Sequence, residues 1–288
     1  ETRIRFDANG KEVKASVYVP RNENGFTVLQ QHIVAPRYGI TQDARGPNSV
    51  VVMSKRKATG GQTLYAKFVI NRSETDEKRS TAGARPAPHG LDEAELTAAR
   101  ALVAQATARS ADRETLVPLI LAALTAKTPE GPAAILLGAN PTRAQVARRI
   151  VAVLSVDGIP ARVVNGLELG DTRRRAQLAR WVEVAIGDKW VVFDPETKRQ
   201  GLPANGLVWW RGGDSLVKLS DNLRTTVNIA VDRLELSALA NVLAMRRSDG
   251  QDVMAYSLYS LPLQTQQVYR LLLMVPIGIF LLVILRNV

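Results

Sequence analysis

The sequence contains no cysteine and only two histidines among its 288 residues. The absence of cysteine excludes disulfide bonds, thiolate metal sites and a cysteine nucleophile. His32 stands alone among apolar and polar neighbours, which favours a structural histidine over a ligand, and His89 has no partner nearby in the sequence, so we assign it no role. The chain also lacks a glycine-rich phosphate loop, metal-ligand spacing and a Gly-x-Ser-x-Gly elbow. We therefore expect no metal site and no cofactor.

The composition is that of a folded protein with a basic surface. Hydrophobic residues make up 46% and charged residues 23%, and the length allows two modest domains. The net charge is +11, from 38 basic and 27 acidic residues. The basic residues form short groups, such as Arg173–Arg175, and no nucleic-acid motif. We therefore expect no nucleic-acid binding, and the charge leaves open a merely solvated surface, anionic lipid headgroups or an acidic partner.

The C-terminal stretch has the composition of a membrane span. Residues 268–288 are nearly all apolar, and about twenty such residues can cross a bilayer. Pro276 and Gly278 are tolerated in a lipid-embedded helix. We predict a transmembrane helix over residues 266–288, the start of a longer membrane region, with a buried core helix as the alternative. Because the chain begins at Glu1 without a signal-like stretch, we also expect an upstream segment that has been removed.

The N-terminal part has the patterns of a β-rich domain. Alternating or β-branched runs separated by turn residues predict strands over Thr2–Phe6, Val13–Val19, Ser49–Met53 and Leu64–Ile70. A small antiparallel sandwich is the natural packing of such strands, and we assign it residues 1–75. Residues 76–90, rich in proline, glycine and charge, are predicted to be a linker.

Three helices are predicted after the linker. The first begins with a capping box at Asp92, and the second covers Glu114–Thr125. Thr142 and Gln145 can form the capping box of the third, which Gly158 is placed to end.

A hairpin follows the helices. The segments 179–186 and 189–193 alternate like strands and are separated by a two-residue turn. In that register Trp181 lies opposite Asp194, and Ala179 is its diagonal neighbour on the same face. Diagonal neighbours are close enough for a long side chain to bridge.

These elements together resemble a known catalytic core. The motifs, in order, are Gly158–Arg162, Trp181–Val184 and Phe193–Pro195. They are similar to the bacterial transglutaminase-like, papain-related core, which implies an α+β domain over residues 91–265. In that family a cysteine, a histidine and an aspartate form the triad, and the resemblance places them at Arg143, Ala179 and Asp194.

The residues at those positions do not support the family's chemistry. A thiol in the first turn of a helix is activated by the amide dipoles, and a histidine oriented by an aspartate serves as its base. Arg143 can neither attack nor deprotonate, and Ala179 has no titratable group. We therefore predict that the chain is not an enzyme and that its triad is degenerate.

The wider layout narrows the resemblance further. A β-rich N-terminal region, a core without cysteine and histidine, the segment Gly206–Gly212 and a membrane segment resemble the inactive transglutaminase domain fused to seven transmembrane helices. This resemblance implies a bacterial inner-membrane protein whose soluble domain faces the periplasm. It also implies an association with an ATP-grasp peptide ligase and an aspartic-type peptidase.

Six residues are candidates for binding a ligand in the former cleft: Arg143, Trp181, Asp194, Trp209, Trp210 and Arg211. The alternatives are core packing for Trp181, a turn role for Asp194, and core or membrane-interface packing for the Trp209-Trp210 pair. Three functions remain open. The first is peptide or protein recognition, scaffolding or signalling through the cleft. The second is a purely structural assembly role, and the third is an unconventional enzyme using Asp194 and Glu183.

Overall fold

The computed structural model describes residues 1–72, 81, 83–110, 112–213 and 215–234. Residues Glu1–Arg233 form one compact unit. Within the described ranges no helix is long and apolar enough to cross a membrane. The predicted transmembrane helix over residues 266–288 lies outside these ranges.

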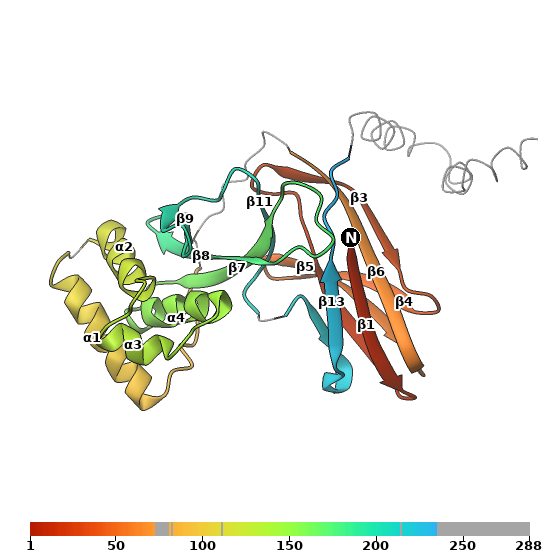
Figure 1. The fold of residues 1–288 in the computed structure, drawn as a ribbon, viewed down its shortest axis with the longest axis horizontal. Helices are drawn as coiled ribbons and strands as arrows, with labels where there is room; N and C mark the ends of the chain where they lie inside the picture. Colours follow the sequence, from red (N-terminus) through yellow and green to blue (C-terminus); the bar gives the residue numbers. More distant parts are fainter. Residues whose placement is uncertain (73–80, 82, 111, 214, 235–288) are drawn as a thin grey trace, which may run out of the picture. The chain divides into compact units, whose positions relative to one another are not determined.

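Two four-stranded antiparallel sheets contain all the N-terminal strands (Figure 1). The first, in the order β13-β1-β6-β3, consists of β1 (Thr2–Asn9), β3 (Phe26–Val34), β6 (Thr59–Arg72) and β13 (Thr225–Ile229). The second, in the order β12-β2-β5-β4, consists of β2 (Val13–Val19), β4 (Gly39–Arg45), β5 (Asn48–Lys55) and β12 (Val217–Leu219). Alternate residues of β1 and β2 are buried, because side chains alternate between the two faces of a strand. Both sheets contribute these residues to one apolar core.

The last strands of the unit return to the N-terminal sheets. Strand β12 pairs with β2, with Val217 opposite Val17, and β13 pairs with β1, with Ile229 opposite Thr2. The sequence analysis assigned residues 1–75 to the β-rich domain and residues 91–265 to the transglutaminase-like domain with its C-terminal extension. The two sheets therefore extend beyond that boundary, because their outer strands β12 and β13 come from the far end of the unit.

The transglutaminase-like part consists of four helices and a five-stranded antiparallel sheet. The helices are α1 (Glu93–Thr107), α2 (Arg113–Leu124), α3 (Pro132–Leu137) and α4 (Arg143–Val156). The sheet has the order β10-β9-β8-β7-β11, with β7 (Ala161–Glu168), β8 (Ala179–Ile186), β9 (Lys189–Asp194), β10 (Arg199–Gln200) and β11 (Gly206–Arg211). A short 3₁₀ helix, Ser220–Asn222, follows β12. Figure 1 shows α1–α4 packed together beside β7 and β8, and their shared core includes Val182 and Val184 of β8.

Local sequence signals set the limits of these elements. Both predicted capping boxes form, Asp92 with Glu95 at α1 and Thr142 with Gln145 at α4. Such caps stabilise a helix by about 1 kcal/mol because they satisfy free backbone N–H groups. Gly158 follows α4 with φ of 69°, a left-handed conformation that glycine adopts without strain. The hairpin of β8 and β9 also has the predicted register, since Ile186 pairs with Lys189.

Candidate functional site

Arg143 is the first residue of helix α4 and lies at the surface. Its side chain is 63% exposed, and its guanidinium Nη2 lies 2.6 Å from Oε1 of Glu196, which is 53% exposed. A cation is unfavourable at a helix N-terminus because the backbone dipoles already place positive charge there. The carboxylate of Glu196 offsets this charge. An exposed pair of this kind contributes about 0.2–1 kcal/mol to stability.

Asp194 ends strand β9 and holds the turn that follows. It is 4% exposed, and its Oδ1 accepts hydrogen bonds from the backbone N–H groups of Glu196 at 2.8 Å and Thr197 at 3.4 Å. Its Oδ2 accepts a hydrogen bond from the Thr197 hydroxyl at 2.9 Å. Both carboxylate oxygens therefore have partners in the turn. This matches the turn role that the sequence left open for Asp194.

Trp181 fills a tightly packed space on the five-stranded sheet. It is 1% exposed and packs with Val164 and Val208, and half-buried Ala179 lies against the same cluster. Gly166 makes this packing possible, because a Cβ there would lie 2.6 Å from Cζ3 of Trp181 and 2.0 Å from the carbonyl oxygen of Leu207. Trp181 is therefore a core residue in this structure.

The Trp209-Trp210 pair packs against the N-terminal sheets. The two residues are 4% and 0% exposed and belong to the core of those sheets. The indole N–H of Trp209 donates a hydrogen bond to the carbonyl oxygen of Tyr18 at 2.9 Å. The ring of Trp210 stacks on the Tyr18 ring with 5.7 Å between centroids. The structure therefore places both tryptophans in the core, which was one of the alternatives.

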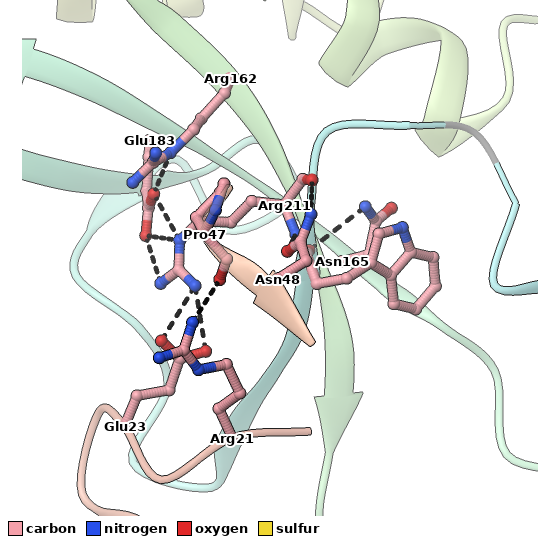
Figure 2. A network of polar contacts seen from close by, with 9 residues as sticks. Arg21, Glu23, Pro47, Asn48, Arg162, Asn165, Glu183 and Arg211 are labelled. Carbon is pink, nitrogen blue, oxygen red and sulfur yellow. Dashed lines mark hydrogen bonds and ion pairs between the residues drawn. The ribbon is translucent and has the colours of Figure 1, made fainter. Parts of the chain in front are cut away.

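Arg211 is the centre of a buried polar network at the end of β11 (Figure 2). Its Nε and Nη2 donate to the carboxylate of Glu183 on β8 at 2.8–3.0 Å. Its Nη1 donates to both carboxylate oxygens of Glu23, between β2 and β3, at 2.9 and 3.0 Å. The side chains of Arg211, Glu23 and Glu183 are 1%, 2% and 3% exposed. One guanidinium therefore joins a carboxylate from the connection between β2 and β3 to one from the five-stranded sheet.

Further contacts fix the two sides of this network. Asn48 is the first residue of β5. Its side-chain Oδ1 accepts a hydrogen bond from the Arg211 backbone N–H at 2.7 Å, and its Nδ2 donates one to the Arg211 carbonyl oxygen at 2.8 Å. Arg162 on β7 donates from Nε to Glu183 at 2.7 Å, and its guanidinium lies 3.8 Å from the centre of the Trp190 ring. Each of the two glutamates in this network therefore has an arginine partner. Balanced partners are required here because an unpaired buried charge is costly.

The network sets the protonation of Glu183. Burial alone would raise the pKa of its carboxyl group, but hydrogen bonds and charge from Arg211, followed by those of Arg162, outweigh burial and hold the pKa below its ordinary value. Burial lowers the pKa of the Arg162 guanidinium, and Glu183 partly reverses this effect. At neutral pH the carboxylate of Glu183 is ionised and fully engaged.

The sequence analysis named Arg211 as a candidate for ligand binding and did not name its partners Glu23 and Asn48. Of the six candidates for ligand binding, five are buried and only Arg143 is exposed. Glu23 and Asn48 were not singled out, because their partner Arg211 lies more than 160 residues further along the chain. A local pattern in the sequence does indicate the backbone position of Glu23. Asn24 and Gly25 form a tight turn with positive φ, which the sequence marks as a turn and which fixes Glu23 beside Phe26.

The described residues contain no group of three or more histidine, cysteine, aspartate or glutamate side chains that could hold a metal ion. His32 lies on β3, paired with Lys67 across the sheet, and His89 accepts a hydrogen bond from the backbone N–H of Leu91.

Comparisons with known families first define the class of protein. Residues 122–195, which include α4, β7, β8 and β9, match the transglutaminase-like superfamily. Residues 1–140 match the family described as an inactive transglutaminase fused to 7 transmembrane helices. Residues 214–288 match the family described as 7 transmembrane helices usually fused to an inactive transglutaminase. These matches confirm the resemblance seen in the sequence, which is to the family described as an inactive transglutaminase fused to 7 transmembrane helices, with a transglutaminase-like core.

Solved structures give more distant similarities. A candidate cysteine protease from Cytophaga hutchinsonii has a TM-score of 0.49 at 14% identity, covering 81% of this chain and 91% of that one. The periplasmic domain of TgpA from Pseudomonas aeruginosa, bound to ethylmercury, has a TM-score of 0.33 at 15% identity, covering 68% of this chain and 89% of that one. The comparison with curated proteins gives no match.

Proposed function

We propose that residues 1–233 form the non-catalytic extracytoplasmic module of a bacterial membrane protein, and that this module is a rigid scaffold for a protein or peptide partner. The observation that supports this proposal most directly is which side chains occupy the positions assigned to the triad and what they contact. Arg143 is paired with Glu196, Ala179 has no reactive group, and the carboxylate of Asp194 is engaged by its own turn. No nucleophile and no general base stand at these positions.

The buried network supports a scaffold rather than a cleft that binds ligands. Arg211 joins Glu23 of the N-terminal region to Glu183 of the transglutaminase-like core, so an N-terminal β-sandwich and that core would move as one body. The aromatic candidates Trp181, Trp209 and Trp210 contribute to packing. A module of this kind presents its surface to a partner, and its rigid core keeps that surface in a fixed shape. By resemblance, an ATP-grasp peptide ligase and an aspartic-type peptidase are the first partners to test.

A second function, recognition of an anionic peptide at the former cleft, is favoured by one observation. The guanidinium of Arg143 is exposed at the N-terminus of α4, where an anion is stabilised by the helix dipole. Glu196 already occupies this guanidinium, so a ligand carboxylate would have to displace it. Removing the charge of Glu196 would then strengthen binding of the ligand.

Affinity purification of the full-length protein from its native membrane separates these functions. The scaffold predicts that the same partner is recovered with the wild type, with Arg143→Glu and with Glu196→Gln. Recognition at the former cleft instead predicts loss of the partner with Arg143→Glu and a gain with Glu196→Gln. If no protein is recovered above an untagged control, the scaffold proposal is wrong.

A further inference from the structure

The loop between β7 and β8 contains three consecutive arginines to which the proposed function gives no role. Arg173, Arg174 and Arg175 are all exposed. An arginine presents a planar set of donors that matches a phosphate group and is more weakly hydrated than a lysine ammonium. Three such residues in a row therefore provide many donors suited to phosphate oxygens within a short segment.

This loop is held against the last described residues of the chain. The backbone N–H of Arg173 donates to the Val231 carbonyl and the N–H of Val231 donates to the Arg173 carbonyl, both at 2.8 Å. The backbone N–H of Ala176 donates to the Ile229 carbonyl oxygen at 2.7 Å, and the Thr172 hydroxyl donates to Oδ1 of Asp232 at 2.8 Å. The arginines are therefore fixed beside residues 229–232 by backbone pairing on both sides of the loop.

Residues 229–233 lead out of the compact unit into the region that resembles a membrane protein. The unit ends at Arg233, and the match to seven transmembrane helices covers residues 214–288. Arg233 is itself exposed and adds a fourth cation to the loop. Two exposed carboxylates, Asp171 and Asp232, lie in the same segments, so positive charge is in excess. Leu234, the next residue, is 43% exposed.

We propose that Arg173, Arg174, Arg175 and Arg233 dock this end of the module on the headgroup phosphates of anionic phospholipids. Each cation near an anionic bilayer contributes about 1 kcal/mol to attraction, within a Debye length of about 10 Å. Three loop arginines would therefore shift the equilibrium between docked and undocked states on the order of 100-fold. Docking would fix the orientation of the scaffold above the membrane. The scaffold function does not require it, so failure of this proposal leaves that function intact.

The absence of cysteine makes a single-label experiment simple. Gln177→Cys, exposed in the same loop, would carry a fluorophore on the full chain reconstituted in nanodiscs that contain nitroxide-headgroup lipid. Lys11→Cys is the matched label control, because it follows the end of β1 opposite to the Thr2–Ile229 pair, about 25 Å away along the strand. Docking predicts strong quenching at position 177 in phosphatidylglycerol nanodiscs and weak quenching in phosphatidylcholine. Quenching at position 11 should be weak in both.

Salt and charge variants test the cause of the quenching. Raising the salt from about 0.1 M to about 1 M shortens the Debye length from about 10 Å to about 3 Å and should abolish the lipid dependence. Replacing the three loop arginines by glutamine should reduce the docked-to-undocked ratio on the order of 100-fold. A control loses the same charge from exposed positions elsewhere and should keep the quenching: Arg45→Gln, Arg56→Gln and Lys57→Gln.

Two results would overturn the proposal. The first is quenching at position 177 that is equal in the two lipids or equal to that at position 11. The second is quenching that the loop variant and the control variant reduce equally, since this would show a response to total charge alone. A loop that bound an acidic protein or free phosphate instead would give the first result.

Discussion

Arg211 and Glu23 form a buried ion pair between residues 188 positions apart in the sequence, with the guanidinium Nη1 2.9 and 3.0 Å from the two carboxylate oxygens. The same guanidinium contacts Glu183, so a single side chain connects the N-terminal sheets to the transglutaminase-like core. These contacts of the transglutaminase-like core stabilise the fold.

Removing the central arginine should be strongly destabilising. Arg211→Ala would leave the carboxylates of Glu23 and Glu183 buried without their main partner, and breaking a buried pair in this way costs about 3–5 kcal/mol. Arg211→Lys should give an intermediate loss, because one ammonium cannot bind two carboxylates with the geometry of a guanidinium. Urea unfolding of the chain in detergent buffer measures both losses.

The exposed pair of Arg143 and Glu196 provides the control for this comparison. Because both side chains are more than half exposed, Arg143→Ala should change the free energy of unfolding by less than about 1 kcal/mol. Equal losses for Arg143→Ala and Arg211→Ala would show that the network around Arg211 does not stabilise the junction.

Acid should remove the contribution of Glu183. Its pKa is lower in the folded chain than in the unfolded chain, so the unfolded state binds more protons at acidic pH and stability rises with pH. The contribution is fully present above the unfolded pKa of about 4.3 and is lost as the pH falls through the folded pKa. The difference in stability between the wild type and Glu183→Gln should therefore shrink between neutral pH and pH values below 4. Parallel stability curves across this range would contradict the assignment.

A methyl group at Gly166 should disrupt the packing of β7. The added Cβ would lie 2.0 Å from the Leu207 carbonyl oxygen and 2.6 Å from the Trp181 ring, and a backbone carbonyl cannot rotate away. Overpacking of this kind costs about 1–3 kcal/mol or more. Gly170→Ala is the matched control, because no atom lies within 4 Å of its added Cβ and its φ is not positive. If thermal unfolding shows equal effects for the two variants, the close approach at Gly166 is not a real constraint.

The elements that sequence reasoning predicted well are those encoded by neighbouring residues. The capping box of Thr142 and Gln145 set the start of α4, and the turn after Ile186 set the register of β8 and β9. Strand β2 has the predicted bounds, Val13–Val19. Strand β4 was not predicted, since all its residues are exposed and its sequence has no apolar alternation.

What could not be predicted is how segments far apart in the sequence pair and cover one another. Strand β13 lies beside β1 because Ile229 meets Thr2, and no local pattern encodes that choice. The Trp209-Trp210-Arg211 run has the composition of a binding surface, since exposed aromatics and arginine are common anchors. Its burial follows from the N-terminal sheets that cover it, with Tyr18 stacked on Trp210. The burial of these three residues could not be predicted from their own sequence.

We propose that the transglutaminase-like core performs no chemistry, and a turnover assay tests this proposal most directly. The full-length protein in nanodiscs would be incubated with glutamine-containing peptides as acyl donors and lysine-containing peptides as acyl acceptors. Cross-linked product would be detected by mass spectrometry, with an active cysteine-dependent transglutaminase as positive control. Wild type and Asp194→Asn should both give no product above the blank. Product formed by the wild type and lost in Asp194→Asn would contradict the claim, because the carboxylate would then be catalytic rather than the acceptor of the turn that follows β9.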